Sequence, residues 1–264
     1  MLPDELRFER HEAVGSTQDV ARAALGEGRD VHGLVIRAQA QTQGRGRLQR
    51  PWASETGGSY QTLVLADGSK SFQVGRTAVA VAVGIAEALS ASGVEVGLKW
   101  PNDLYRAGER FHTPKCEESD GELGRGRDGN LDGKLGGKLG GKLGGVLCEH
   151  VRGHLLVGVG VNVRNRPPAG AVGLPSLDPD EVSDIVLRGI RAGLDELLAD
   201  PALPGRFARF DLLAGRRLRV LDGGRQLRGW ARGVDADGRL LLATDSGTSR
   251  TSSGRIVEID AAAD

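Results

Sequence analysis

Arginine and glycine alternate in the segment "QTQGRGRLQRPW", residues 41–52. Arg45 and Arg47 stand two residues apart, so both guanidinium groups can project from one side of an extended loop. A guanidinium group binds a carboxylate or a phosphate through paired hydrogen bonds, and neighbouring glycines let the backbone approach a ligand closely. The segment therefore predicts an anion-binding loop. Arg-Gly dipeptides also occur in solvated loops and in RNA-binding tails, but such tails rarely lie between two β-strands.

Two further segments place polar side chains beside apolar strands. "KWPND", residues 99–103, groups a cation, an aromatic ring, an amide and a carboxylate around a proline turn. "GVGVNV", residues 158–163, places Asn162 in an otherwise apolar strand. A buried amide must find hydrogen-bond partners, and either an adenine edge or a neighbouring loop would supply them. Both segments are candidates for ligand contacts, and a purely structural role for Asn162 stays open.

Ser16 and Thr17 open a segment, residues 16–28, whose apolar residues follow helical spacing and which closes in glycine-rich sequence. The free N–H groups and the dipole of a helix N-terminus attract an anion or a carbonyl oxygen. The same two residue types also cap helices without binding any ligand. The pattern predicts a helix start that has one of these two roles.

The tetrad Lys-Leu-Gly-Gly is repeated three times in "GKLGGKLGGKLGGVLCEH", residues 133–150. Only Lys142, in the third tetrad, is followed directly by apolar strand residues. A lysine without a strand behind it cannot be held in the geometry that catalysis requires. We expect Lys142 to be the lysine that takes part in catalysis. Lys134 and Lys138 are expected to belong to a duplication in a surface insertion. The alternative is that the lysine-rich loop attracts an anionic ligand or an acidic partner.

The helices and strands that must position these residues are predicted from the spacing of apolar residues and from the glycines and prolines that interrupt it. Helical patterns are expected at residues 74–92, as a buried helix, and at residues 181–199, as an amphipathic helix. Short strands are expected at residues 33–39, 59–66, 94–99, 145–150 and 154–163. The last stretch, residues 214–260, predicts a small all-β unit of its own. The charged, glycine-rich stretch at residues 106–141 predicts a flexible insertion.

Charge and composition argue against a nucleic-acid-binding, a secreted or a membrane protein. Lys plus Arg and Asp plus Glu both number 35, so no global charge favours nucleic acid or an anionic membrane. The N-terminus has no signal-peptide pattern, and no run approaches the roughly 18 apolar residues of a membrane span. We expect a cytoplasmic protein with no membrane partner, in which Cys116 and Cys148 are free thiols, although a disulfide between them stays open.

Taken together, the order "GST", "QTQGRGRLQRPW", "KWPND", "KLGGVLCE" and "GVGVNV" resembles the biotin–protein ligase family, also called biotin–[acetyl-CoA-carboxylase] ligase. The resemblance runs from about residue 10 to residue 260 and is interrupted by the insertion. It implies an α+β fold of the class II synthetase type, with a mixed β-sheet flanked by helices. The implied division is a catalytic domain at residues 1–213 and an SH3-like β-barrel at residues 214–264.

The resemblance also implies a reaction. Biotin and ATP, with Mg²⁺, would give biotinyl-5′-AMP, and biotin would then be transferred to a lysine of a biotin carboxyl carrier domain. Because the resemblance begins near residue 10, we expect the short form, without a DNA-binding domain and without DNA as a partner. The chain would be a monomer or a homodimer. The motifs leave the identities of the metal ligands and of the acceptor protein undetermined.

The resemblance assigns roles residue by residue. Catalysis is expected from Lys142, Arg47 and Asp103, where Asp103 would orient or deprotonate the acceptor lysine. Biotin would be bound by Ser16, Thr17, Gln18, Gln41, Gly44, Arg45, Gly46, Arg47, Lys142 and Gly145. ATP and the adenylate would be bound by Arg45, Arg47, Trp52, Lys99, Asn102, Lys142 and Asn162. Trp52 and Trp100 would wall the site or belong to the core.

The chain departs from the family pattern at three positions. Leu48 stands where a third basic residue is frequent, and Gln49 stands where glycine is usual, although glycine tolerates backbone geometries that glutamine does not. Near the C-terminus, Arg255 in "GRIVEID" replaces a usual glutamate and so reverses a charge.

Two other functions are compatible with these motifs. The first is a lipoate or octanoyl transferase of the same fold, which a ligand-binding assay would separate from a biotin ligase. The second is a non-catalytic nucleotide- or RNA-binding protein that uses the Arg-Gly loop and the small β-unit, which salt-dependent RNA binding without biotin-dependent pyrophosphate release would support.

The repeat itself generates a test. Lys142→Ala is expected to lower biotinyl-5′-AMP formation roughly a hundredfold to a thousandfold, the effect of losing one charged contact in a transition state. Lys134→Ala and Lys138→Ala serve as matched controls and are expected to behave like the parent. Biotin-dependent ATP–pyrophosphate exchange measures all three. Loss of activity only in the triple variant would contradict the assignment of a single lysine.

Overall fold

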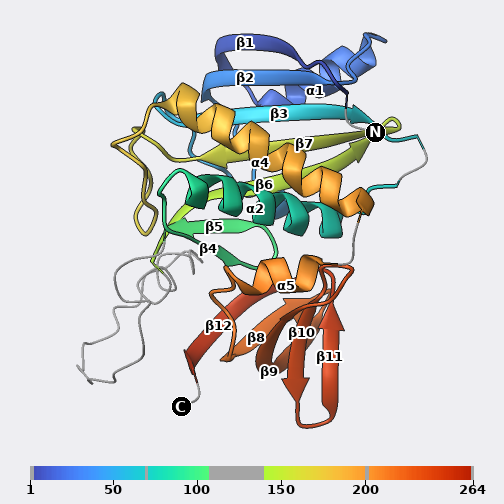
Figure 1. The fold of residues 1–264 in the computed structure, drawn as a ribbon, viewed down its shortest axis with the longest axis vertical. Coiled ribbons are helices and arrows are strands. Elements are labelled where there is room, and N and C mark those ends of the chain that lie inside the picture. The colour runs from blue at the N-terminus through green and yellow to red at the C-terminus, as the bar shows by residue number, and fades with distance from the viewer. Residues whose placement is uncertain (1–2, 69–70, 107–139, 200–201, 263–264) are drawn as a thin grey trace.

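The computed structural model describes residues 3–68, 71–106, 140–199 and 202–262. Two β-sheets with four helices form the described part of the chain (Figure 1). The first sheet contains β1 (Arg7–Val14), β2 (Leu34–Gln41), β3 (Ser59–Ala66), β4 (Val96–Lys99), β5 (Asp103–Arg106), β6 (Gly141–Val151) and β7 (His154–Val161). The helices are α1 (Thr17–Gly26), α2 (Val74–Ala91), α4 (Pro179–Ala199) and α5 (Leu203–Ala208), and a short 3₁₀ turn spans Arg47–Gln49.

The first sheet is mixed, as predicted. Its seven strands run in the order β1-β2-β3-β7-β6-β5-β4, with β1 parallel to β2 and all other neighbours antiparallel. The hairpin β6–β7 turns at Arg152 and Gly153, both with positive φ. Strand β1 has no counterpart in the prediction, because its charged sequence "RFERHEAV" alternates exposed and half-buried residues at a sheet edge.

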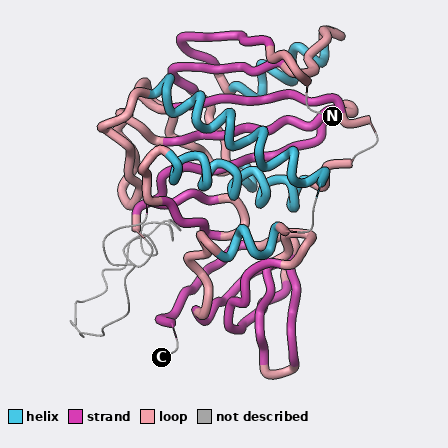
Figure 2. Tube along the Cα trace, in the orientation of Figure 1, coloured by secondary structure: helices cyan, strands magenta, loops and turns pink. Residues whose placement is uncertain are grey.

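Opposite faces of this sheet are covered by different helices. Alternate side chains of β2, β3 and β7 point to opposite sides. Ile36, Val64 and Leu156 pack with Ala21 and Ala24 of α1. The other face packs on α2 and α4, which lie side by side across the sheet (Figures 1 and 2). The sheet therefore separates a main core, on the α2 side, from a smaller α1 side on which a ligand could be received.

Helices α2 and α4 approach closely through glycines. A Cβ atom at Gly84 would lie 2.2 Å from the carbonyl oxygen of Gly189, and one at Gly193 would lie 2.5 Å from that of Ala80. Such contacts are far inside van der Waals distance, so only glycine allows this helix spacing. The remaining apolar face of α4 is buried as predicted, with Val182, Ile185, Val186, Ile190 and Leu194 inside.

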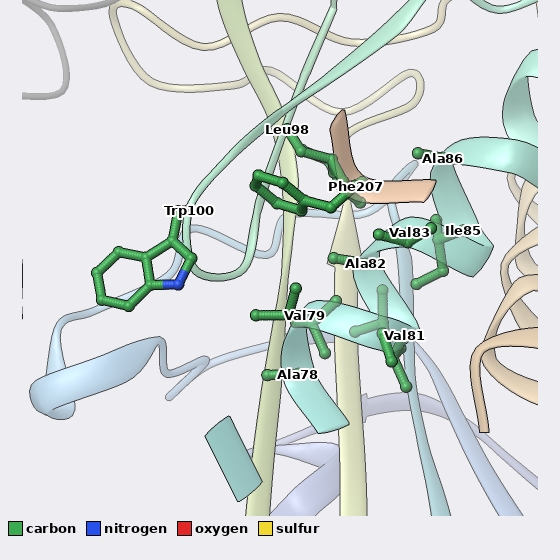
Figure 3. Close-up of a cluster of buried hydrophobic side chains, with 14 of the residues drawn as sticks. Ala78, Val79, Val81, Ala82, Val83, Ile85, Ala86, Leu98, Trp100 and Phe207 are labelled. Atoms are coloured by element: carbon green, nitrogen blue, oxygen red, sulfur yellow. The ribbon is translucent and has the colours of Figure 1, made fainter. Parts of the chain in front are cut away.

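The expectation that no segment has the length and apolar character of a membrane span is wrong for α2. This helix has 18 residues and passes that test by composition. Most of this helix is covered: 61% of its window is buried inside the protein, where it contacts the sheet and α4. Its apolar surface is explained by its place in the core, where Val79, Val81 and Val83 are fully buried (Figure 3).

The C-terminal part is all β, as predicted. It contains β8 (Arg216–Asp222), β9 (Arg225–Val234), β10 (Leu240–Thr244), β11 (Gly247–Thr251) and β12 (Arg255–Ala262). These strands form an antiparallel sheet in the order β11-β10-β9-β8-β12, in which β11 and β12 pair on one side only. The expected barrel is therefore an open, five-stranded sheet among the described residues.

The two sheets are joined by one continuous core. Leu98 of β4, Phe207 of α5 and Leu242 of β10 belong to the same buried cluster, part of which Figure 3 shows. The Leu98 N–H donates to the carbonyl oxygen of Phe210, and the Leu98 carbonyl oxygen accepts from Leu212. The division at residue 213 stays a prediction, and the packing shows that the C-terminal sheet is held firmly against the "KWPND" turn.

Trp100 is a core residue at this junction. Its side chain is 2% exposed and its indole N–H donates to the carbonyl oxygen of Gly238, at 2.9 Å. The structure places the Trp100 side chain in the core, and Trp100 is also among the residues that line the cavity described below.

The predicted insertion has narrower bounds in the described chain. Arg106 ends β5 and Gly141 begins β6, because both pair in the sheet. Residues 107–139, with Cys116, Lys134 and Lys138, lie outside the described residues. Cys148 is a free, buried thiol, as predicted, and burial raises its pKa to about 12.

Asp211, which follows α5 at the junction of the two sheets, makes the stability of the fold depend on pH. Its Oδ1 atom accepts from the Leu213 N–H, whereas Oδ2 is buried without a partner among the described residues. Burial raises the pKa of Asp211 to about 6, while two backbone N–H groups oppose the rise. The folded protein therefore binds a proton here that the unfolded chain releases near pH 4.

This carboxyl should destabilise the fold as pH rises. Its contribution is fully present below pH 4 and is lost between pH 4 and 6. Relative to Asp211→Asn, which cannot ionise, the parent's free energy of unfolding should fall by at most about 3 kcal/mol between pH 4 and 7. Urea unfolding of both proteins across this range measures the difference. A difference that does not change with pH would contradict the burial of the charged carboxylate.

Candidate active site

A cavity of about 970 Å³ opens on the α1 side of the first sheet. Its walls come from the α1 N-terminus, the arginine loop, the "KWPND" turn, β6, β7, the segment 168–171 and the start of β12. The volume lies at the upper end of the range for small-molecule sites. The cavity is the meeting point of the motifs that the sequence singles out.

Glycines form the floor. Gly158 and Gly160 of β7 face the α1 side, since they share the parity of Leu156, which packs on α1. A Cβ atom at Gly158 would lie 2.7 Å from Nε2 of Gln18, and one at Gly160 would lie 2.7 Å from Nε1 of Trp52. The alternation "GVGV" therefore places valines in the main core and lets the Gln18 and Trp52 side chains approach the opposite face closely.

The N-terminus of α1 forms one end of the cavity. Ser16 occupies the cap position but makes no side-chain cap hydrogen bond, although it is 4% exposed. Gln41 Oε1 accepts from the Thr17 N–H at 2.9 Å, and Gln18 Nε2 donates to the Leu147 carbonyl oxygen at 2.9 Å. These contacts hold uncharged polar groups rigidly at this end. They suit a neutral ligand group with several donors and acceptors, such as a cyclic urea.

The two arginines of the loop have different surroundings. Arg45 forms paired hydrogen bonds with Asp19 of α1, which lower the pKa of the Asp19 carboxyl. Arg47 has no such partner among the described residues, and burial lowers its pKa while the charge of Asp103 opposes this effect. Arg45 therefore anchors the loop to α1. Arg47 is the one with a guanidinium group available for an anionic ligand.

The tip of the loop explains why glycine is usual there. Leu48 and Gln49 have φ values of 56° and 58°, in the left-handed region that favours glycine. The Leu48 side chain is 74% exposed. A non-glycine residue in this region costs roughly 1–2 kcal/mol, so the departure at Gln49 stores strain in the loop.

Lys142 lies at the centre of the cavity wall. Its Nζ atom is 2.8 Å from Oδ1 of Asp103 on β5 and 5.3 Å from the centre of the Trp52 ring. Both charged side chains are more than four-fifths buried. A desolvated ammonium held by a carboxylate and an aromatic face has a fixed direction, which an exposed lysine lacks.

A β-bulge turns Lys142 toward the cavity. Along β6, Val146 and Cys148 pack in the main core, and regular alternation would also send residue 142 to that face. The pairing with β5 shifts between Leu104 and Tyr105, so that Leu143 takes the core position instead. The shift depends on Gly144, where a Cβ atom would lie 2.5 Å from the Gly160 carbonyl oxygen.

Two asparagines support this arrangement. Asn102 donates to the Val146 carbonyl oxygen at 2.6 Å. Asn162, 1% exposed, donates to the Lys142 carbonyl oxygen at 3.5 Å and accepts from Asn165. Both side chains line the cavity, yet their amide groups already bind the backbone of β6. Asn162 therefore has the structural role that the sequence left open, because its amide group binds the Lys142 carbonyl oxygen and Asn165. Its contact with a nucleotide stays a prediction.

Every residue assigned to the site from sequence lines this one cavity. The set is Ser16, Thr17, Gln18, Gln41, Gly44, Arg45, Gly46, Arg47, Trp52, Lys99, Asn102, Asp103, Lys142, Gly145 and Asn162. Lys99 is buried against the Tyr105 ring, 5.7 Å from its centre. Their ligand contacts stay predictions.

Sequence reasoning missed several lining residues. Among the described residues, the cavity also takes in Gly158, Gly160, Arg50, the segment 168–171 and residues 254–256. The glycines carried a signal, since "GVGV" has no side chains on one face. The unusual Arg255 carried another.

Charge is strongly unbalanced in the cavity. The cations that line it are Arg45, Arg47, Arg50, Lys99, Lys142 and Arg255, whereas Asp103 is the one carboxylate among the described lining residues. Low-dielectric walls strengthen such a field, so the cavity attracts polyanionic ligands. It is an anion site with a neutral, glycine-floored end.

The described residues form no protein-held magnesium site beside this cavity. The described residues contain no group of three or more His, Cys, Asp or Glu side chains that could hold a metal ion. Asp103, the single carboxylate in the described walls, already pairs with Lys142. These residues do not form a ligand set for Mg²⁺.

Two family models match this chain. Residues 12–164 match the model described as "Biotin/lipoate A/B protein ligase family". The chain belongs to this family. Residues 214–257 match the model "Biotin protein ligase C terminal domain".

Individual relatives agree with this membership. The chain is 29% identical to a protein from Mycobacterium tuberculosis named "Biotin--[acetyl-CoA-carboxylase] ligase", over 93% of this chain and 86% of that one. The structure is similar to a biotin protein ligase from Aquifex aeolicus in complex with biotin and ATP, with a TM-score of 0.72, 26% identity and coverage of 95% and 97%. A Helicobacter pylori synthetase with bound biotinylated ATP shares the fold, with a TM-score of 0.60, 20% identity and coverage of 94% and 99%.

The bulge at Gly144 generates a test with a neighbouring control. Gly144→Ala should destabilise the protein by about 1–3 kcal/mol and displace Lys142, because the added methyl group meets a backbone carbonyl oxygen. Gly145→Ala should be tolerated in the fold, since its nearest contacts lie at 3.5 Å. Urea unfolding measures both variants. Equal stability of the two would contradict the close approach at Gly144.

Proposed function

We propose that this chain activates biotin with ATP and transfers it to a lysine of a biotin carboxyl carrier domain. The observation that carries the proposal is a single cavity with an uncharged, glycine-floored end beside α1 and a cationic part around Lys142 and Arg47. Biotin combines the same two properties, because its ureido ring is neutral and its carboxylate is charged. The relatives named for biotin support this substrate over other carboxylic acids.

In the first step, an oxygen of the biotin carboxylate attacks the α-phosphorus of ATP, and the bond to pyrophosphate breaks. The carboxylate is already ionised at pH 7, so the step needs no general base. It needs cations that bring two anions together and stabilise the developing charge. Lys142 and Arg47 supply these charges, and the ion pair with Asp103 fixes the direction of Lys142 before the substrates arrive.

In the second step, the amine of the acceptor lysine attacks the carbonyl carbon of biotinyl-5′-AMP, and AMP leaves. Asp103 is the carboxylate in the described walls from which the incoming ammonium could be oriented. While it pairs with Lys142, it serves the first step by holding that lysine. In the second step, we propose that Asp103 orients or deprotonates the acceptor lysine.

A lipoate or octanoyl transferase is the second candidate, because the matching family includes lipoate ligases by name. The match of residues 214–257 to a biotin protein ligase C-terminal domain favours biotin. Biotin-dependent exchange of pyrophosphate into ATP by the purified protein decides between them. Exchange that depends on lipoate or octanoate would overturn the proposal, as would RNA binding with no exchange at all.

Arg47→Gly should leave the fold intact but loosen retention of biotinyl-5′-AMP, because a charged contact worth roughly 1.5–3 kcal/mol is lost. The dissociation rate of the adenylate should rise about 10- to 100-fold, and unrelated proteins in the mixture should become biotinylated. Arg47→Lys keeps the charge and should fall between the variant and the parent. Unchanged adenylate release with no labelling of bystanders would remove Arg47 from the site.

A further inference from the structure

Arg255 reaches the cavity from the C-terminal sheet. It is the first residue of β12 and is half-buried, and with Gly254 and Ile256 it lines the same cavity as Lys142. The described residues contain no hydrogen-bond or ion-pair partner for its guanidinium group. A cation that lines the cavity without an anionic partner among the described residues can bind an anionic ligand.

The backbone that carries Arg255 is fixed. Ser253 and Thr251, on the segment that leads into β12, donate to the two carboxylate oxygens of Asp222, at 2.6 and 2.7 Å. Gly254 has a φ of 135°, and a Cβ atom there would lie 2.9 Å from the Leu221 carbonyl oxygen. Ile256 is buried next to it. These contacts hold Arg255 at one place on the cavity rim.

The order of the strands says which part of a ligand Arg255 meets. Helix α1 lies over β2, β3 and β7, Lys142 lies on β6 and Asp103 on β5, and the C-terminal sheet follows beyond β4 (Figure 1). Gln18 and Arg255 are therefore at opposite ends of the cavity, with the Lys142–Asp103 pair between them. The indole hydrogen bond from Trp100 to Gly238 fixes the second end against the "KWPND" turn.

Phosphoryl transfer places the attacking and leaving oxygens in line on opposite sides of phosphorus. If biotin lies at the α1 end, its carboxylate oxygen forms the new bond to the α-phosphorus near Lys142. The bond from the α-phosphorus to the bridging oxygen then breaks toward the C-terminal sheet, and pyrophosphate takes the electron pair.

We propose that Arg255 binds the β- and γ-phosphates of ATP and so stabilises the pyrophosphate leaving group. This inference rests on the proposed function for the identity of the reaction.

The test separates the two half-reactions. Arg255→Gln should lower kcat/KM for ATP in biotin-dependent pyrophosphate exchange roughly 10- to 100-fold, the loss expected for one charged hydrogen bond. Transfer from supplied biotinyl-5′-AMP to the carrier domain should stay within about twofold of the parent, because no pyrophosphate takes part in it. Arg255→Lys, which keeps a positive charge, should recover part of the exchange activity.

Arg232→Gln is the matched control, because Arg232 is exposed on β9 and does not line the cavity. It should leave both half-reactions like the parent. Titration with inorganic tripolyphosphate, followed by calorimetry, should show weaker binding to Arg255→Gln than to Arg232→Gln. Equal tripolyphosphate binding by the two variants, or an equal fall in both half-reactions, would overturn the assignment. A parent without biotin-dependent exchange would overturn the proposed function instead, and tripolyphosphate binding would still decide the role of Arg255.

Discussion

The ion pair between Lys142 and Asp103 is the interaction on which the rest of the site depends. It joins β6 to β5 across 2.8 Å, in a wall where each side chain is largely withdrawn from water. The register shift between β5 and β6 lets Lys142 reach the cavity face while Leu143 stays in the core. The Lys-Leu-Gly-Gly sequence thus has a physical meaning in its third copy, where lysine, apolar anchor and close-approach glycine each have a defined place.

The two faces of the sheet around this pair have different roles: one packs the core and the other lines the cavity. One face is closed by α2 and α4, whose glycine-mediated contact gives a dense core. The other face has glycines where the core face has valines, and α1 and the arginine loop cover it only partly. Arg45 ties that loop to α1 through Asp19, which leaves Arg47 for the ligand. Rigid support on one face therefore permits an open, charged site on the other.

Sequence reasoning selected residues that line one cavity, because they are concentrated in short polar motifs. Ser16, Arg47, Asp103 and Lys142 come from distant parts of the chain, and the structure brings all of them to one cavity. Interactions between segments could not be read in the same way. The pairing of Arg45 with Asp19 and the bulge that turns Lys142 require knowledge of which strands and helices are neighbours. The edge strand β1 was missed because its alternation of charge is weak, and Arg255 stood out as a departure whose place only the fold supplies.

The most direct test is a crystal structure of this chain with biotinyl-5′-AMP bound. The account predicts that the ureido ring lies over Gly158 and Gly160. It also predicts that Lys142 Nζ donates a hydrogen bond to an oxygen of the phosphate or the anhydride while it remains paired with Asp103. An adenylate bound in this cavity with Lys142 turned away, or with the Lys142–Asp103 pair broken and Lys142 out of hydrogen-bond reach, would contradict it.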